Sequence, residues 1–118
     1  MKARPTKNIG GHFVSCPAKE ATHLIIHLPG PSGVMIIPIG TKPGWTWNTD
    51  TEKPTLRPSL LSSMGRDGSV ICHSWVTDGK ASFLPDCSHS LKGKTCDLID
   101  VADTGPGLNQ DQNSSTVE

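Results

Sequence analysis

The feature that most constrains the fold is the dipeptide Asp78-Gly79, which stands between two runs of β-prone residues. Asp-Gly in this setting is the strongest short-range signal for a hairpin with a two-residue loop. If these two residues form the loop, four pairs of residues face each other across the strands: Thr77 and Lys80, Ser74 and Phe83, His73 and Leu84, and residue 71 and Asp86. The sequence therefore predicts a β-hairpin within residues 71–89.

This hairpin carries two of the five histidines and two of the four cysteines of the chain. Side chains alternate between the faces of a strand, so His73 and Asp86 project from one face as diagonal neighbours, about 5–8 Å apart. Cys72 and Cys87 are diagonal neighbours on the opposite face. The hairpin therefore offers an imidazole beside a carboxylate on one side and a pair of thiols on the other.

The rest of the composition favours short strands. The 118 residues suffice for one domain, and 34% hydrophobic content with 12 Gly and 10 Pro is typical of a turn-rich chain with a small core. We expect a mainly β, compact single domain of short antiparallel strands and hairpins. Its boundaries are a flexible N-terminal arm at residues 1–10, a β domain at residues 11–101 and a disordered tail at residues 102–118.

Other segments outside the central hairpin also read as strands. Residues 23–28 and 34–39 form a first hairpin around a Pro- and Gly-rich turn. Residues 45–47 are a short extended piece. The prolines in residues 54–61 exclude a helix interior, so this segment is an edge strand or an ordered loop. A last strand is expected within residues 95–99.

The charge balance excludes some partners. Eleven basic and eleven acidic residues give a formal net charge of +0, which argues against nucleic acid and anionic membranes as partners. No run approaches the roughly 18 apolar residues of a membrane span, and the start of the chain lacks an apolar signal-peptide core. We therefore expect a cytoplasmic protein, in which cysteines are free thiols or metal ligands rather than disulfides.

The first candidate site joins Ser59, His73 and Asp86. A serine hydroxyl becomes a good nucleophile when an imidazole accepts its proton, and a carboxylate then orients the imidazole. Ser59 follows Pro58, which fixes the local backbone, on a segment that could lie beside the hairpin. The simpler alternative is that Ser59 makes a loop hydrogen bond while His73 and Asp86 form a weak surface pair.

The second candidate is a zinc site, with zinc as the one cofactor to consider. Its ligands would be four residues of the hairpin, with Cys16 as a further donor: Cys72, His73, Cys87 and His89. Thiolates and imidazoles suit zinc. Adjacent strand residues point to opposite faces, however, so Cys72 and His73 can both bind one ion only at a bulge. We favour no metal, because the cysteines can equally be small buried hydrophobic residues.

Trp45 and Trp47 form the third candidate. They lie on one side of an extended segment and could bind a substrate, although core packing is the simpler use of them in a chain with few other aromatic residues.

Several motifs resemble a small phage and bacterial family that includes BubE, a peptidase of bacterial ubiquitination-like operons. The resemblance covers residues 11–99 and rests on these motifs: Gly11-His12-Phe13, Cys16-Pro17, Trp45-x-Trp47-Asn48, Lys53-Pro54-Thr55-Leu56-x-Pro58-Ser59-Leu60, Cys72-His73-x-Trp75-Val76, and Asp86-Cys87-x-His89-x-Leu91-x-Gly93. Many phage members are called ammonia monooxygenases, an activity for which this sequence has no copper-ligand array.

The resemblance implies a serine peptidase that trims or removes a ubiquitin-like protein, in the bacterial host of a phage or prophage. Carried over by motif, Ser59 is the nucleophile, His73 the general base, Asp86 the orienting carboxylate and His89 a reserve base. The substrate would be a ubiquitin-like protein or its conjugates, whose extended tail could add to a sheet edge. Many relatives have CPGC where this chain has CPAK at residues 16–19, so a metal knuckle there is incomplete.

We favour the serine hydrolase, because hairpin register and resemblance separately place His73 beside Asp86. Two alternatives stay open. One is a zinc hydrolase or zinc-stapled module. The other is a non-catalytic phage accessory protein that binds a host factor through its tryptophans and a sheet edge.

Overall fold

Two antiparallel sheets pack face to face in the computed structural model, which describes residues 1–41 and 44–102. The first sheet has the order β2-β1-β3-β4, with these bounds: β1 (Ala3–Ile9), β2 (His12–Ser15), β3 (His23–His27) and β4 (Val34–Pro38). The second sheet has the order β5-β6-β7-β8-β9, with these bounds: β5 (Thr46–Trp47), β6 (Leu56–Met64), β7 (Val70–Thr77), β8 (Lys80–Phe83) and β9 (Thr95–Asp97). A short 3-10 helix, η1 (Ala18–Glu20), follows β2. The expected mainly β fold is confirmed.

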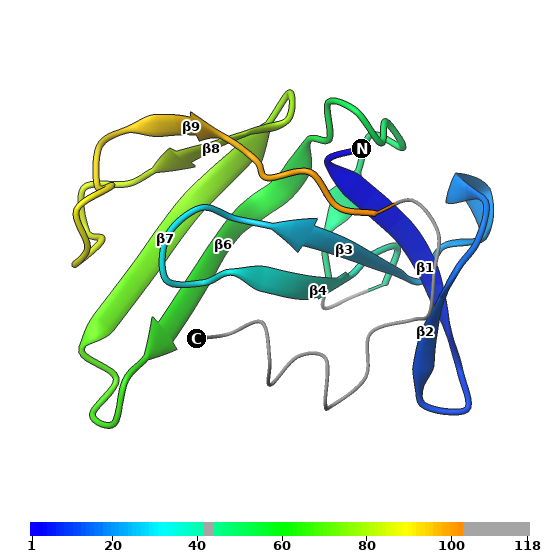
Figure 1. Ribbon diagram of the computed structural model, residues 1–118, viewed down its shortest axis with the longest axis horizontal. Coiled ribbons are helices and arrows are strands. Elements are labelled where there is room, and N and C mark those ends of the chain that lie inside the picture. Colours follow the sequence, from blue (N-terminus) through cyan, green and yellow to red (C-terminus); the bar gives the residue numbers. More distant parts are fainter. Residues whose placement is uncertain (42–43, 103–118) are drawn as a thin grey trace.

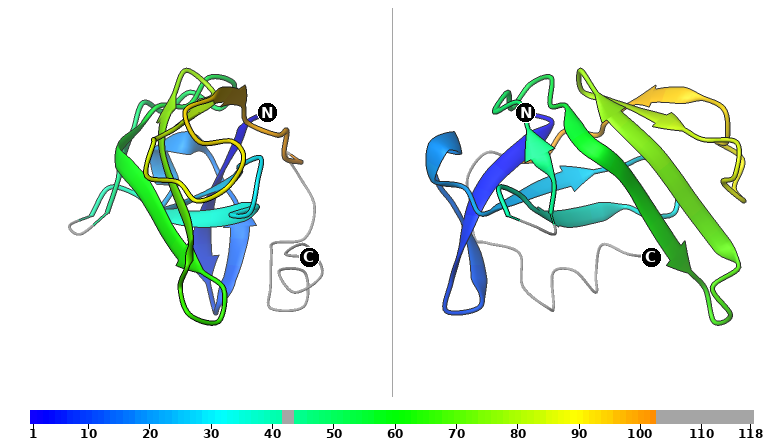
Figure 2. Two further views of the ribbon diagram at one scale, coloured as in Figure 1. Left: turned by 90° about the vertical axis from the view of Figure 1, so that its left-hand side faces the viewer. Right: turned by 180° about the vertical axis from the view of Figure 1, so that it is seen from behind.

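The hydrophobic core lies between the two sheets. In Figure 1, β3 and β4 pass in front of β6 and β7, and the reverse view in Figure 2 has β6 and β7 in front. Leu24 and Ile26 of β3 belong to the same buried cluster as Leu56, Leu60 and Val76 of the second sheet. Burial of apolar area between the sheets is therefore what holds the two layers together.

The hairpin of β7 and β8 has the predicted register from Thr77 and Lys80 to Ser74 and Phe83. Asp78 and Gly79 both have positive φ, 50° and 77°, as a two-residue loop of this kind requires. A side chain at Gly79 would also bring its Cβ within 3.1 Å of the Glu52 carbonyl oxygen. The turn residues thus fix which side chains of β7 face each sheet surface.

Beyond Phe83 the predicted register is wrong. The Leu84 N–H still donates to the His73 carbonyl at 2.8 Å, but the chain then turns, and the Cys87 N–H donates to the Leu84 carbonyl at 3.1 Å. The Ile71 carbonyl accepts from Ser88 at 3.0 Å, so residue 71 does not face Asp86. Asp86 comes from a turn rather than from a continued strand.

The expectation of an edge strand or loop at residues 54–61 is corrected at Leu56 and Arg57, which pair with the two-residue strand β5, whereas from Leu60 onward β6 pairs with β7 alone among the described strands. Its pairing with β7 is irregular between Leu56 and Leu60, and the Arg57–Pro58 peptide bond is cis. Proline lacks an N–H donor, so it fits inside a sheet where the ladder is interrupted. This irregular segment carries Ser59.

The expected flexible arm at residues 1–10 is in fact strand β1, which pairs with both β2 and β3. Ala3 and Thr6 are fully buried, and the Lys2 ammonium donates to the Leu98 carbonyl at 2.8 Å. The β domain therefore begins at β1 and not at residue 11. The strands expected within residues 23–28, 34–39 and 95–99 are confirmed as β3, β4 and β9.

The predicted tail lies outside the described residues, apart from Ala102. Within the described residues, no helix has the length and apolar character needed to cross a membrane.

Candidate active site

Ser59, His73 and Asp86 form a continuous chain of hydrogen-bonding contacts. The Ser59 Oγ lies 2.9 Å from the His73 Nε2, and the His73 Nδ1 lies 2.9 Å from the Asp86 Oδ2. Both distances are within the normal hydrogen-bond range. The imidazole thus contacts a hydroxyl with one nitrogen and a carboxylate with the other, which is the arrangement of a serine nucleophile, its base and an orienting acid.

Three separate segments bring these groups to the outer face of the second sheet. Leu61 on β6 pairs directly with His73 on β7, so Ser59 is the diagonal neighbour of His73 on that face. Asp86 reaches the imidazole from the turn that follows β8. The predicted contact between His73 and Asp86 is present, although it arises from a turn and not from a continued hairpin.

The site is sheltered but open to solvent. The side chain of His73 is 23% exposed and that of Asp86 is 57% exposed, while Ser59 is half-buried. A substrate carbonyl can therefore approach Ser59 from the outer face without rearrangement of the core. Because the carboxylate is exposed, solvent screens its charge and weakens its electrostatic effect on the imidazole.

The Cys87 thiol holds the backbone of His73 in place. The His73 N–H donates to the Cys87 Sγ at 3.2 Å, and the Cys87 thiol donates to the His73 carbonyl at 3.1 Å. Cys87 is 3% exposed and Cys72 is 2% exposed, and both face the core as expected of the thiol pair. Burial raises the pKa of the Cys72 thiol, so this residue is neutral near pH 7.

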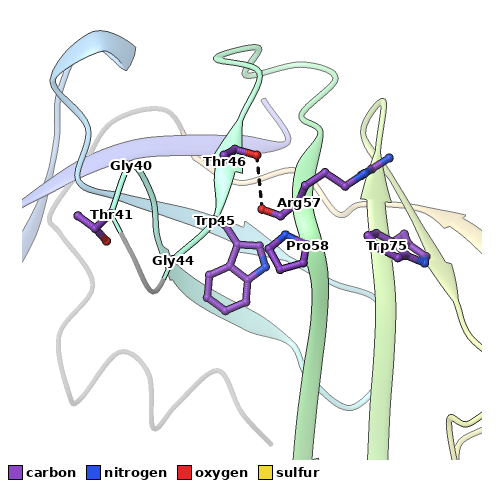
Figure 3. Close-up of a pocket in the computed structure, with 8 residues that line it drawn as sticks. All are labelled: Gly40, Thr41, Gly44, Trp45, Thr46, Arg57, Pro58 and Trp75. Carbon is purple, nitrogen blue, oxygen red and sulfur yellow. Dashed lines mark hydrogen bonds between the residues drawn. The ribbon is translucent and has the colours of Figure 1, made fainter.

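A groove of about 650 Å³ adjoins the serine. Figure 3 shows the Trp45 indole beside the Pro58 ring, with Trp75 on the neighbouring strand. The Trp45 Nε1–H donates to the Ser59 carbonyl at 3.3 Å, which ties the groove to the residue that carries the hydroxyl. The lining is mainly apolar, so the groove suits an apolar group next to the reactive centre.

Trp75 and Arg57 are groove residues that the sequence reasoning did not identify. The Arg57 guanidinium lies 5.1 Å from the centroid of the Trp75 ring, in cation–π contact. It also donates to the Leu56 and Val76 carbonyls and to the Thr77 Oγ1, at 2.7, 3.1 and 3.0 Å. The signal was the spacing, because Trp75 stands two residues after His73 and so shares its face.

Trp45 and Trp47, the predicted substrate-binding pair, do not form one platform. Trp47 lines a separate depression of about 320 Å³, and its Nε1–H donates to the Asp50 carbonyl at 3.2 Å. Both indoles also pack partly against the core. Only Trp45 is therefore beside the serine.

His89, the predicted reserve base, lies on the core side of the sheet. Its ring packs edge-on against the buried Phe83, with 5.1 Å between ring centroids, and its Nδ1 accepts from the Leu91 N–H at 3.3 Å. The structure therefore corrects this assignment, because Ser59 is on the outer face, where His73 already occupies the position of the base.

The four residues proposed as zinc ligands do not converge. Cys72 and Cys87 face the core, whereas His73 faces outward, as the alternation of a regular strand requires. Within residues 1–41 and 44–102, no three His, Cys, Asp or Glu side chains gather in an arrangement that could hold a metal ion. The bulge that such a site would need is absent between Cys72 and His73, where β7 stays in register with β6.

Comparison with known proteins adds one match. No curated protein and no solved structure is significantly similar to the chain. Residues 4–84 match the model of a family described as the serine protease of bacterial ubiquitination-like systems, BubE. The matched segment runs from β1 to just beyond β8, and it contains both Ser59 and His73. Because the match covers more than half of the sequence, this chain belongs to the BubE family.

Proposed function

We propose that this chain is a serine peptidase that cleaves a peptide or isopeptide bond at the C-terminal tail of a ubiquitin-like protein. The observation that carries the proposal is the unbroken hydrogen-bonded series from the Ser59 hydroxyl through His73 to Asp86, with 2.9 Å at each contact. Membership of a serine protease family supports the same reaction class.

In the proposed reaction His73 acts first as a base. Its Nε2 accepts the proton of the Ser59 hydroxyl while the Ser59 Oγ attacks the substrate carbonyl carbon. The Asp86 carboxylate accepts a hydrogen bond from the Nδ1–H and stabilises the imidazolium that forms. This assigns the neutral imidazole the tautomer with the proton on Nδ1, because Nε2 must be free to accept.

The second half of the cycle reverses these proton transfers. His73 donates the proton from Nε2 to the leaving amine, and the acyl group stays on the Ser59 Oγ as an ester. A water molecule, deprotonated by the same nitrogen, then hydrolyses that ester and restores the hydroxyl. The oxyanion of each tetrahedral intermediate needs hydrogen-bond donors, and the backbone N–H groups beside Ser59 are the expected ones.

The family and the form of the site support the proposed substrate class. BubE is described as the serine protease of a bacterial ubiquitination-like system, which supports a ubiquitin-like protein as the substrate. The site lies on the outer face of a sheet and not in a closed cavity, so an extended protein tail can reach it while the folded part stays outside. The apolar groove beside Ser59 gives such a tail a surface to bind.

The decisive experiment combines covalent labelling with cleavage. We expect a fluorophosphonate probe to label Ser59, located by mass spectrometry, and we expect wild type to cleave a ubiquitin-like protein extended by a C-terminal reporter. Ser59→Ala and His73→Ala should both abolish cleavage. Cleavage that persists in either variant would refute the proposal.

The same assay tests the two alternatives. If a zinc ion performs the reaction, chelation abolishes cleavage and elemental analysis of untagged protein finds zinc in stoichiometric amount. If the chain is a non-catalytic binding protein, Ser59 is not labelled and binding to its partner survives Ser59→Ala. We expect full cleavage after chelation, because the proposed steps use only side chains of the chain.

A further inference from the structure

The surroundings of Ser59 differ on its two sides. On one side lie His73 and, beyond it, Asp86. On the other side lies the groove, entered past Pro58 and walled by Trp45 and Trp75. Trp75 follows His73 on the same face of β7, farther from Asp86 along the strand. A substrate bound across the serine therefore meets the imidazole in one direction and the groove in the other.

The chemistry of proton transfer gives these two directions different roles. His73 must pass its Nε2 proton to the departing amine, so the leaving group lies on the imidazole side. The acyl part, which becomes bonded to the Ser59 Oγ, extends the other way. We propose that the groove binds the acyl side of the substrate and sets specificity for a large apolar side chain there. This inference rests on the proposed serine peptidase function.

The lining determines the chemical class of that side chain. Two indoles and a proline ring provide the apolar walls of the groove. The Arg57 Nη1 donates to the Leu56 and Val76 carbonyls and its Nη2 donates to the Thr77 hydroxyl, so these nitrogens already have partners within the sheet. The guanidinium therefore steadies the Trp75 ring, and the mainly apolar lining favours an apolar or aromatic group.

A second depression lies next to the groove. The depression around Trp47 has about 320 Å³ and shares Gly40 and Thr46 with the groove. An extended acyl segment that runs over Thr46 can place one side chain in each, since alternate residues of a strand are about 7 Å apart. This arrangement fits an extended tail, and it gives Trp47 a role one step farther from Ser59.

Trp75 is the residue through which to test this subsite, because it is 36% exposed and its truncation leaves the core intact. The probes are two peptidyl diphenyl phosphonates that share the phenoxide leaving group, so only the acyl side varies. One carries a benzyl side chain and the other a carboxymethyl side chain. The Ser59 Oγ attacks phosphorus, one P–O bond to phenoxide breaks, and phenol leaves with the hydroxyl proton.

We expect wild type to react about tenfold or more faster with the benzyl probe, in line with the discrimination of an apolar pocket. Trp75→Ala should reduce this ratio several-fold by slowing the benzyl probe alone, and Trp75→Phe should largely preserve it. The matched control is Ile9→Ala on β1, an exposed apolar residue remote from the groove, which should not change the ratio.

Each outcome separates this inference from the proposed function. Equal rates for the two probes in wild type, or an unchanged rate ratio in Trp75→Ala, would overturn the assignment of the groove to the acyl side. In either case, labelling of Ser59 would still support the proposed peptidase function. Failure of every phosphonate to label Ser59 would overturn the proposed function itself. Urea unfolding of Trp75→Ala should match wild type closely, so that a changed ratio reports the groove and not loss of fold.

Discussion

The two faces of strand β7 differ sharply although they alternate residue by residue. Cys72 points into the core, is 2% exposed and has a raised pKa because it is buried. His73, the next residue, points outward and contacts a serine and a carboxylate. The same division extends to β6, where Leu60 is buried at 2% exposure and Leu61 is 62% exposed.

In the second sheet, neighbouring residues of one strand therefore serve different purposes: one contributes to stability and the next to the proposed reaction. The inner face supplies apolar area to the core between the sheets, whereas the outer face holds the reactive groups and the groove. Apart from Cys87, whose thiol contacts the His73 backbone, side chains of one face can therefore be changed with little effect on the other face. If the separation is real, activity and unfolding free energy will respond to different substitutions on the same strands.

The largest expected effect is the loss of activity in Ser59→Ala or His73→Ala. Removing the nucleophile or its base should lower kcat/KM by roughly 10⁴-fold or more, as in other serine hydrolases. Both side chains are on the outer face, so the unfolding free energy should change by less than about 1 kcal/mol. Cleavage assays and urea unfolding on the same preparations measure the two quantities. A loss of several kcal/mol in stability would break the proposed separation of the faces.

Asp86→Asn should have a smaller effect on activity. The amide can no longer stabilise the imidazolium as the carboxylate does, but Asp86 is 57% exposed, so its contribution is partly screened. We expect kcat/KM to fall by about 10²- to 10⁴-fold, up to the size of the effect in buried triads. Asp67→Asn is a matched control, because Asp67 is an exposed turn aspartate that makes its contact with Ser69 instead. Equal activity in Asp86→Asn and wild type would show that this carboxylate is only a surface partner.

Leu60→Ala and Leu61→Ala form the sharpest test of the comparison, because they are the same substitution at adjacent positions of β6. Leu60→Ala should destabilise the protein by about 2–5 kcal/mol through lost burial and a residual cavity. Leu61→Ala should change the unfolding free energy by about 0.5 kcal/mol or less. Urea unfolding curves report both values. Similar destabilisation by the two variants would show that Leu61 also packs against a neighbour.

Much of this arrangement could be predicted from local sequence. Asp78-Gly79 fixed the register of the central hairpin, and alternation along β7 then separated Cys72 from His73. Those two steps were enough to place an imidazole on the outer face and a thiol in the core. They also predicted Asp86 as the partner of His73, but from a continued hairpin, whereas the contact comes from a turn after β8.

The rest depended on contacts between distant segments. Residues 3–9 look like a polar arm, and only pairing with β3 reveals that the small side chains of Ala3 and Thr6 are buried. Pro58 suggests an edge strand, and pattern alone shows neither the short pairing of β5 with Leu56 and Arg57 nor the irregular ladder between β6 and β7. Local sequence does not place Trp75 in the site, because its groove is completed by Trp45, which precedes β5 and reaches the groove only in the folded chain.

The smallest expected effect is a pH dependence that arises from Cys72 on the inner face. Burial raises the pKa of this thiol above its ordinary value of 9.0, so the folded state favours the neutral form more than the unfolded state does. The stabilisation is fully present below pH 9.0 and is lost as the pH rises through the folded pKa. Urea unfolding between neutral pH and pH 10.5 should therefore show falling stability in wild type and a shallower fall in Cys72→Ala.

The control for this measurement is Cys16→Ala, because burial raises the pKa of Cys16 too, although Cys16 is only half-buried and lies outside the second sheet. If the two variants flatten the pH profile equally, the inner face of β7 has no special effect on its thiol. If Cys72→Ala flattens it more, the same strand that exposes His73 to substrate also keeps its neighbour protonated. Adjacent residues would then differ in solvent exposure and in role because of the face that each one occupies.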